Sequence, residues 1–352
     1  MTHTHWPDIE AAIHNRIIML DGAMGTMLQK HKFTEEQFKG EAYKDWPSLL
    51  KGNNDLLSIT QPDAVRGVHA KFFAAGADMI ETNTFNATTL SQADYNLQDH
   101  ADTIALAGAK LARSVADEWT ARTPHKPRVV LGSIGPLSKT LSLSPKVEDP
   151  GYREVDFDAV VATYRAQMSV MFDYVDALLI ETVFDTLNAK AAIFAAETVF
   201  KDKGRKLPIL ISGTITDRSG RTLSGQTTEA FWASIAHARP FAVGLNCALG
   251  ADEMRPYIHT LSKIAGCHIM AFPNAGLPNA FGEYDQTPQT MSEQVSPWAH
   301  EGMVNILGGC CGSTPEHIRA IADGVTDATP RIAPVITPTL RLSGLEPFTL
   351  AG

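Results

Sequence analysis

Three of the four cysteines in this 352-residue chain lie in glycine-rich surroundings that would let their sulfurs converge on one metal ion. Cys247 occurs in GLNCALG, and Cys310 and Cys311 are adjacent in LGGCCGST. Thiolates are soft ligands that favour zinc or copper(I). Three of them fill three corners of a zinc tetrahedron, and an open fourth corner is typical of a catalytic site. We therefore predict a zinc site here; the alternative is three inert thiols, or a disulfide between the two adjacent cysteines.

The other candidate metal ligands are less suitable. Cys267 precedes a predicted strand instead of following one, which indicates a structural residue. No histidine follows a predicted strand end, so no histidine ligand is indicated. Four cysteines are too few for a disulfide scaffold, and the first ten residues lack the pattern of a secretory signal. We expect a reducing, cytoplasmic compartment.

Acidic and small residues follow several other predicted strands. Glu81 and Glu181 are carboxylates that could bind a substrate ammonium group, with Glu181 the stronger candidate, or pair with a basic residue. The turn Asp21-Gly22-Ala23-Met24-Gly25-Thr26 offers backbone N–H groups to a carboxylate, although it could equally be an ordinary strand-to-helix turn. Together with a thiolate-bound metal, these groups suit a zwitterionic amino acid that carries a zinc ligand.

Strands and helices that alternate along the chain would position these residues. Eight short, nearly continuous apolar runs are typical of strands buried on both faces of a parallel sheet. They are Arg16–Leu20, Ala77–Glu81, Arg128–Ser133, Val175–Glu181, Leu207–Ser212, Phe241–Leu245, His268–Phe272 and Met303–Leu307. Helical patterns separate them over Pro62–Ala75, Asp99–Ala121, Asp156–Val175, Asp185–Lys201, Thr227–Ala238, Ala251–Ala265 and Gln289–Glu301, and Thr314–Gly324 follows the last. We predict an α/β fold, a (β/α)8 TIM barrel, with an open doubly wound sheet as the alternative. The candidate residues would then meet at the carboxyl ends of the strands.

Composition narrows the class of protein further. Apolar residues make up 44% and charged residues 20%, and the formal net charge is −9. These values are typical of a globular protein with a sizeable core, and they argue against nucleic-acid binding. No apolar run approaches the length of a membrane span, so no membrane association is expected.

The predicted barrel occupies residues 1–329 as a single domain. Extra chain lies between Met27 and Gln61, where the first two strands are unusually far apart. Residues 330–352 contain prolines at intervals and are predicted to form an extended tail or linker.

Four motifs give the chain a resemblance to a known family. DGAMGTMLQ at 21–29, ETNTF at 81–85, GLNCA at 244–248 and GGCCGSTPEHI at 308–318 resemble the homocysteine-binding module of cobalamin-dependent methionine synthase. The resemblance covers residues 10–325, and the wider family of homocysteine S-methyltransferases shares the three cysteines. The tail LRLSGLEPF at 340–348 resembles the segment that leads into the folate-binding module of the cobalamin enzyme.

The resemblance implies an S-methyltransferase that activates homocysteine as a zinc thiolate and produces methionine. Its cofactors would be Zn²⁺ and methylcobalamin, the methyl donor, which a separate cobalamin-binding module or subunit would carry beside a folate-binding one. Glu181 would hold the ammonium group of homocysteine, and the turn at Asp21–Thr26 would engage the amino-acid end of the same molecule. Asn274, after the seventh strand, is a possible oxygen ligand to zinc in the absence of substrate, or simply a turn residue.

Three alternatives remain open at this point. A betaine- or S-methylmethionine-dependent homocysteine methyltransferase would share the barrel and the zinc, although the tail argues against it. A non-catalytic subunit of a split corrinoid enzyme would bind homocysteine without methylating it. A zinc-stabilised barrel could also catalyse unrelated lyase chemistry.

Overall fold

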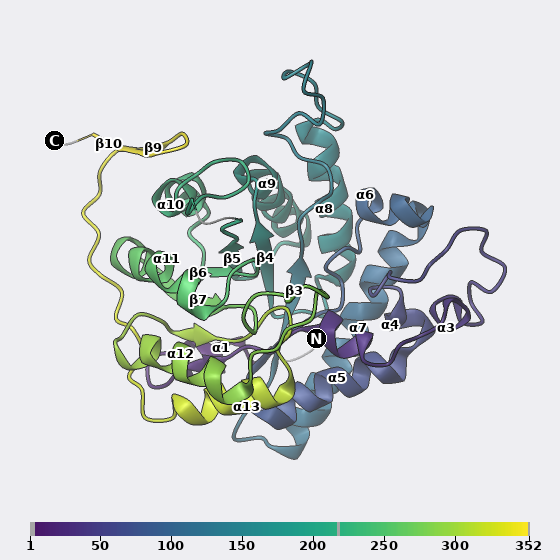
Figure 1. Cartoon of the computed structure of the whole chain (residues 1–352), viewed down its shortest axis with the longest axis horizontal. Coiled ribbons are helices and arrows are strands. Elements are labelled where there is room, and N and C mark those ends of the chain that lie inside the picture. Colours follow the sequence, from purple (N-terminus) through teal and green to yellow (C-terminus); the bar gives the residue numbers. More distant parts are fainter. Residues whose placement is uncertain (1–3, 217–218, 351–352) are drawn as a thin grey trace.

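Eight parallel strands form a barrel in the computed structural model, which describes residues 4–216 and 219–350 (Figure 1). The strands are β1 (Ile18–Met19), β2 (Met79–Glu81), β3 (Val129–Ile134), β4 (Ala177–Val183), β5 (Ile209–Gly213), β6 (Ala242–Asn246), β7 (His268–Phe272) and β8 (Ile306–Leu307). Their order is β1-β8-β7-β6-β5-β4-β3-β2, and a parallel bridge from Leu20 to Met79 joins the two ends. The (β/α)8 prediction is confirmed, and the open sheet is wrong.

Side chains along each strand point alternately into the barrel and out toward the helices, and both sets are buried, so the apolar runs are continuous. In β3, Val129 and Leu131 belong to a cluster that fills the barrel interior, whereas Val130 packs outward against the helices. Helix α1 (Trp6–Ala12) adds Trp6 to the interior cluster, and the Trp6 and Phe241 rings meet edge to face with centroids 4.8 Å apart. Both faces of the sheet are therefore buried, as a parallel sheet requires.

A long helix returns the chain after each strand and covers the outside of the barrel (Figure 1). These helices are α5 (Pro62–Ala75), α7 (Ala101–Arg122), α8 (Phe157–Met171), α9 (Thr186–Lys203), α10 (Thr228–Ile235), α11 (Ala251–Ile264), α12 (Pro288–His300) and α13 (Pro315–Gly324). All eight predicted helices are present, with shifts of a few residues at their ends. Side-chain caps start several of them: Asp156 accepts from the N–H of Ala159, and Thr314 begins α13 with a capping box.

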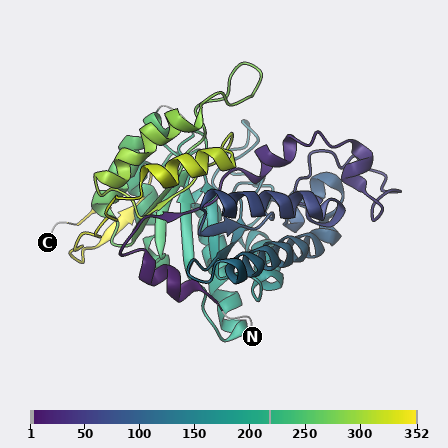
Figure 2. The same cartoon turned by 90° about the horizontal axis from the view of Figure 1, so that it is seen from below.

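The extra chain between β1 and α5 projects from the side of the barrel (Figure 2). It contains α2 (Met24–Gln29), α3 (Glu35–Lys39) and α4 (Leu57–Thr60). Buried amides attach it to the loop after β2: Asn53 Nδ2 donates to Gln92 Oε1 at 2.7 Å, and Asn83 Nδ2 donates to the Asn54 carbonyl at 2.8 Å. The same loop contains α6 (Thr89–Gln92). This insertion thus contributes to one wall of the barrel mouth.

The tail runs without helix or strand along residues 329–340 and then forms a hairpin that the proline spacing did not predict. Strands β9 (Arg341–Ser343) and β10 (Pro347–Thr349) pair antiparallel beside α10. Ser343 Oγ donates to the Ala230 carbonyl at 2.6 Å. The tail also begins inside the folded body, because the buried Arg331 guanidinium donates to three carbonyl oxygens at the end of α11 and the start of β7.

His69 on α5 gives the fold a testable dependence on pH. Its side chain is fully buried, neither ring nitrogen has a hydrogen-bond partner among the described residues, and burial lowers its pKa to about 3. In the unfolded chain, a histidine takes up a proton below about pH 6.5. In the folded protein, His69 stays unprotonated until the pH falls to about 3. Stability is therefore lost as the pH falls through this window, by roughly 2 kcal/mol at pH 5.

We expect His69→Leu to raise the free energy of unfolding at pH 7, because it removes an unpaired buried polar group. The gain should be about 1 kcal/mol at pH 7 and larger by roughly 2 kcal/mol at pH 5. Urea unfolding at the two pH values measures both. The exposed His125→Leu serves as the control and should change stability little at either pH. An equal effect of His69→Leu at pH 7 and pH 5 would contradict the assignment.

Candidate metal centre and substrate cavity

The three predicted cysteines meet at the carboxyl end of the barrel. Cys247 directly follows β6, while Cys310 and Cys311 lie in the loop after β8. Their sulfurs all lie within 4.8 Å of one another, and Sγ of Cys247 is 3.8 Å from Sγ of Cys311. All four cysteines of the chain are free thiols, so the adjacent pair forms no disulfide. The structure brings together the residues that the spacing predicted.

One edge of this sulfur triangle has the length expected for two thiolates on zinc. Zinc–thiolate bonds of about 2.3 Å in a tetrahedron place neighbouring sulfurs about 3.8 Å apart, which is the separation of Cys247 and Cys311. The thiols also share protons: hydrogen bonds from Cys247 and Cys310 lower the pKa of the Cys311 thiol. The donor set and its spacing therefore fit a zinc ion held by three thiolates.

Left-handed backbone makes the convergence possible. Gly312 has φ +82°, and a Cβ atom there would lie 2.3 Å from Cβ of Tyr284, so only glycine fits. After β6 the turn falls on non-glycine residues instead: Cys247 has φ 60° and Ala248 has φ 58°. Such conformations are unfavourable for residues with a Cβ atom and often occur at functional sites.

A cavity of about 420 Å³ opens onto the sulfurs. Its lining includes the three cysteines and the predicted residues Asp21, Gly22, Ala23, Thr26, Glu81 and Glu181. It also includes Asn54, Asp55, Asn83, Phe85, Ser133, Thr182, Phe272 and Tyr284, which sequence reasoning did not select. The cavity is large enough for a small amino acid, and it places acidic and aromatic groups around the metal ligands.

The acidic residues of the cavity form a buried cluster. Asp21 Oδ2 accepts from the N–H of Glu81 at 3.1 Å, and Ser133 Oγ donates to the Glu181 carboxylate. Burial raises the pKa of Asp21 and Glu81 well above their usual values, and it raises the pKa of Glu181 to about 7. None of the described residues that line the cavity is Lys, Arg or His. No basic partner thus neutralises these carboxylates, and perturbed acids without partners are typical of a site for a cationic group.

The turn at Asp21–Thr26 is tied to the cysteine loop. Thr26 Oγ1 accepts from the N–H of Gly312 at 2.9 Å, and Ser313 Oγ accepts from the N–H of Ala23 at 3.2 Å. A Cβ on Gly22 would lie 2.8 Å from both Phe72 and Ser313, so glycine allows this close approach. The N–H of Ala23 therefore has a protein partner, which the prediction of a backbone cradle did not foresee.

Asn274 lies two residues after the end of β7, following the strand as expected, but it does not line the cavity. Its side chain is buried, and Oδ1 has no hydrogen-bond partner among the described residues. A buried amide oxygen without a partner is unusual and points to a missing ligand. The role of Asn274 as a metal ligand stays a prediction.

Tyr284 is the most informative residue that sequence reasoning missed. It comes from the long loop between β7 and α12, and its side chain packs closely on Gly312, next to Cys311. Burial and this negatively charged neighbourhood raise the pKa of the phenol. The sequence offered only a weak signal, a single aromatic residue in a loop that follows a strand end.

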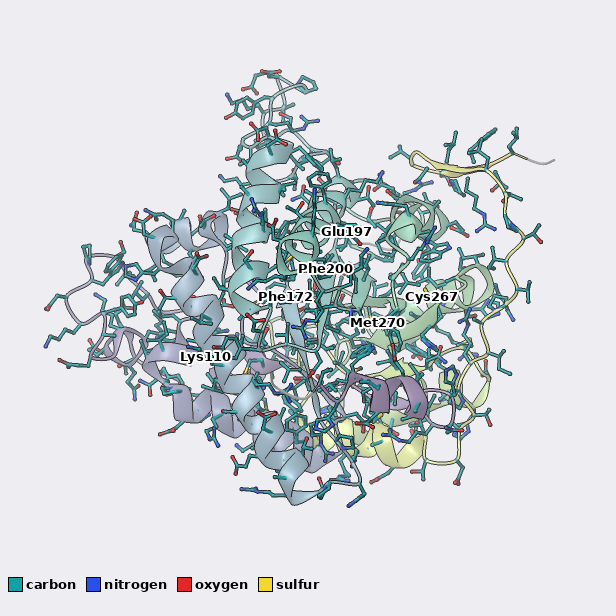
Figure 3. All side chains as sticks on the ribbon, turned by 180° about the vertical axis from the view of Figure 1, so that it is seen from behind. Lys110, Phe172, Glu197, Phe200, Cys267 and Met270 are labelled. Carbon is teal, nitrogen blue, oxygen red and sulfur yellow. The ribbon has the colours of Figure 1, made fainter. Side chains whose placement is uncertain are left out.

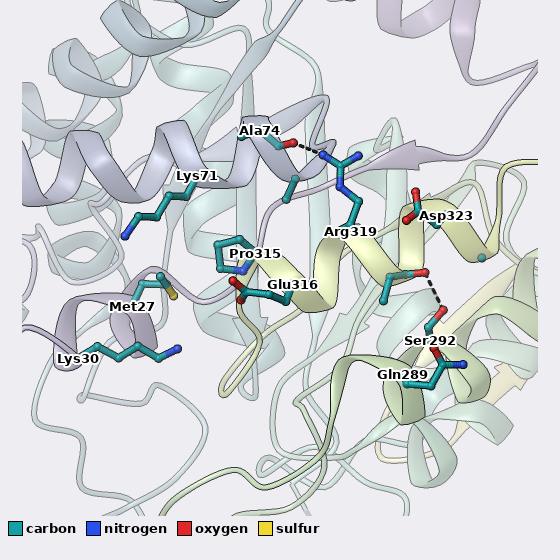
Figure 4. A pocket seen from close by; sticks show the side chains of 13 residues that line it. Met27, Lys30, Lys71, Ala74, Gln289, Ser292, Pro315, Glu316, Arg319 and Asp323 are labelled. Carbon is teal, nitrogen blue, oxygen red and sulfur yellow. Dashed lines mark hydrogen bonds between the residues drawn. The ribbon is translucent and has the colours of Figure 1, made fainter.

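Two other features lie outside this site. Cys267 precedes β7 at the opposite end of the strand from the cavity, consistent with its predicted structural role (Figure 3). A larger hollow of about 1050 Å³ lies on the outer surface between α2, α5, α12 and α13, where Arg319 donates to the Ala74 carbonyl (Figure 4). Its lining contains no cysteine among the described residues. The chemistry therefore belongs to the smaller cavity inside the barrel mouth.

A TIM barrel with a three-cysteine centre in its mouth is the class of protein that fold and site define. The chain belongs to the homocysteine S-methyltransferase family, whose model matches residues 18–325. This confirms the resemblance seen in the motifs. No helix of the described residues is long and apolar enough to cross a membrane.

Solved structures of one enzyme resemble the chain over most of its length. The homocysteine methyltransferase MmuM from Escherichia coli in its metallated form is 21% identical, with a TM-score of 0.67; the match covers 89% of this chain and 98% of MmuM. The oxidised form of MmuM is 21% identical, with a TM-score of 0.67, and the match covers 87% of this chain and 95% of MmuM. The apo form is 20% identical, with a TM-score of 0.61, and the match covers 88% of this chain and 96% of MmuM. At this identity the likeness establishes the shared fold.

Proposed function

We propose that this protein methylates homocysteine at a zinc ion held by Cys247, Cys310 and Cys311, giving methionine. The observation that carries the proposal is the sulfur triangle, whose 3.8 Å edge matches the spacing of thiolates on zinc. Membership of the homocysteine S-methyltransferase family and the likeness to an enzyme solved in a metallated form support it. A reducing compartment such as the cytoplasm would keep the three thiols free.

The roles of the residues follow from their chemistry. Zinc bound there would act as a Lewis acid that lowers the pKa of a coordinated substrate thiol from about 8.5. Glu181, oriented by the Ser133 hydroxyl, would bind the ammonium group in the buried acidic cluster, with Glu81 beside it. The amino-acid end of homocysteine would be enclosed by Asp21, Gly22, Ala23 and Thr26. Asn274 would provide an oxygen ligand to the zinc ion when no substrate is bound. Phe85, Phe272 and Tyr284 line the cavity and limit the entry of water.

For the methyl donor we propose methylcobalamin, carried on another module or subunit beside a folate-binding one. The support is the tail at 340–348, which resembles the segment that precedes the folate module in the cobalamin enzyme. A second candidate is a cationic donor such as betaine or S-methylmethionine. The acidic and aromatic lining of the cavity favours it, because carboxylates and aromatic faces both attract onium groups.

One assay separates these donors. Zinc-loaded protein is mixed with homocysteine and with free methylcobalamin, S-methylmethionine or betaine in separate reactions, and methionine is measured. We expect methionine from methylcobalamin, and none after chelation of the metal. The chelated protein should keep its far-UV circular dichroism, because a barrel with this core does not need zinc to fold.

The other results would each favour a different function. Methionine from a cationic donor alone would assign the chain to the betaine or S-methylmethionine type. Homocysteine binding without methionine from any donor would indicate a binding subunit. Absence of both zinc and homocysteine binding would contradict the proposed function.

A further inference from the structure

Asn246, the last residue of β6, contacts both halves of the site through one side-chain amide. It is fully buried. Its Oδ1 accepts from the backbone N–H of Thr182 at 3.0 Å, and its Nδ2 lies 2.8 Å from Oγ1 of Thr182 and 3.8 Å from Sγ of Cys310. Thr182 directly follows Glu181 in β4. A single amide therefore joins the strand that carries the acidic residue to the loop that carries two metal ligands.

The orientation of this amide is fixed by its neighbours. The backbone N–H of Thr182 can only donate, so it must face Oδ1 and not the NH₂ group of Asn246. The two hydrogens of Nδ2 are then directed to the Thr182 hydroxyl and to the Cys310 sulfur. A thiolate is an acceptor, so the second contact becomes stronger when Cys310 is ionised.

The backbone around this amide adopts unfavourable conformations. Thr182 is β-branched and has φ 53°, and the register between β4 and β5 shifts between Ile180 and Val183. Cys247, the next residue after Asn246, also has a positive φ of 60°. Such residues persist only where the surroundings hold them. Both hydrogen bonds between Asn246 and Thr182 act on one of these strained residues.

We propose that Asn246 is a positioning residue that sets the metal ligands and the amino-acid site together. Its N–H donates to the Cys310 sulfur and aims it at the other two sulfurs. Its bonds to Thr182 hold the preceding peptide so that the Glu181 carboxylate faces the cavity. This inference rests on the proposed function, since it assumes zinc at the cysteines and an amino acid at Glu181.

The chain contains a matched residue at the other end of the barrel. Asn305 is also buried; its Oδ1 accepts from the N–H of Ile269 at 3.0 Å, and its Nδ2 donates to the Arg331 carbonyl at 2.8 Å. Like Asn246, it joins two neighbouring segments through its side-chain amide, but it lies just before β8, at the opposite end of the strands from Cys247, Cys310 and Cys311. Asn305→Asp therefore measures the effect of a buried Asn→Asp change without a contact to the site.

Two substitutions separate the two roles of Asn246. Asn246→Asp keeps an oxygen for the Thr182 N–H and can accept from the Thr182 hydroxyl, but it loses the donor to Cys310. Thr182→Val keeps that donor and removes the hydroxyl. We expect Asn246→Asp to weaken zinc binding by about ten- to hundredfold, as loss of an outer-shell partner does. Thr182→Val should keep wild-type zinc affinity and bind homocysteine several-fold more weakly.

The measurements are a chelator competition titration for zinc, calorimetry with homocysteine, and the absorption spectrum of the cobalt(II)-substituted protein. Loss of an N–H donor to a thiolate raises the energy of the sulfur electrons. The sulfur-to-cobalt charge-transfer bands of Asn246→Asp should therefore shift to longer wavelength, which a purely structural role would not cause. Asn305→Asp should change neither zinc affinity nor the spectrum. Asn246→Leu, which has the same branching and no charge, replaces Asn246→Asp if a buried carboxylate prevents folding.

The outcomes distinguish the inference from the function beneath it. Folded Asn246 variants with wild-type zinc affinity and cobalt spectrum would overturn the role of Asn246, while zinc binding by the wild type would leave the proposed function intact. Equal loss of zinc in Asn305→Asp would also overturn it, because the effect would then be general destabilisation. A wild-type protein that binds no zinc would overturn the proposed function and this inference with it.

Discussion

Replacing Cys247, Cys310 or Cys311 by alanine is expected to reduce zinc affinity by several hundredfold. Each sulfur supplies one of three protein ligands to the same ion, and binding energies of about 10–16 kcal/mol at four-ligand zinc sites correspond to roughly 3–4 kcal/mol per ligand. The three variants should therefore lose zinc to a comparable extent, and methyl transfer with it. Metal analysis after dialysis against a competing chelator measures the effect.

Cys267→Ala is the matched control for this series. Cys267 is also a partly buried free thiol, but it precedes β7 and lies outside the cavity. It should keep zinc content and activity unchanged. If Cys311→Ala retained zinc fully, the three-thiolate assignment would be wrong, even though its sulfur lies 3.8 Å from that of Cys247.

Glu181→Gln is expected to weaken homocysteine binding by roughly ten- to hundredfold while zinc stays bound. The change removes the negative charge and keeps the shape of the side chain and an acceptor for Ser133. Losing a charge-assisted hydrogen bond to an ammonium group costs about 1.5–3 kcal/mol. Calorimetric titration of the zinc-loaded variant with homocysteine gives the change in affinity directly.

A thiol without an amino group provides the control for Glu181. A simple alkyl thiol has nothing for the carboxylate to bind, so wild type and Glu181→Gln should bind it with nearly equal affinity. Normal homocysteine binding by the variant, or loss of its zinc, would show that Glu181 is structural. The ammonium site would then have to lie elsewhere in the acidic cluster, with Glu81 as the next candidate.

Under the proposed function, the acidic cluster would link the choice of methyl donor to the recognition of substrate. Asp21, Glu81 and Glu181 share one buried wall, and their mutual repulsion and burial raise the pKa of Asp21 and Glu81. A single bound cation would stabilise the ionised forms of all three. Whichever cationic group enters the cavity, the ammonium of homocysteine or an onium donor, therefore meets the same wall.

The sequence by itself determined the barrel and indicated the three cysteines that meet at its mouth. Strands buried on both faces appear in the sequence as continuous apolar runs, and helices appear as apolar residues with a period of 3.6 residues. Both kinds of element can therefore be recognised from the sequence alone. The cysteines at 247, 310 and 311 follow predicted strands, and all parallel strands of a barrel end at the same rim. Membership of the family was evident from the same motifs.

Only the tertiary structure decided which other residues complete the site. Asn246 in β6 contacts the Cys310 sulfur, Tyr284 in the loop after β7 packs on Gly312 beside Cys311, and neither residue has a spacing that marks it. The left-handed conformations of Thr182 and Cys247 are equally invisible in the sequence, because local residue preference does not favour them; Thr182 is held by a hydrogen bond to a residue 64 positions away. The surroundings of the Asn274 amide and of the Ala23 N–H are likewise formed by segments that are distant in the sequence. Long-range contacts of this kind depend on how the strands register in the closed barrel, which periodicity and motif do not encode.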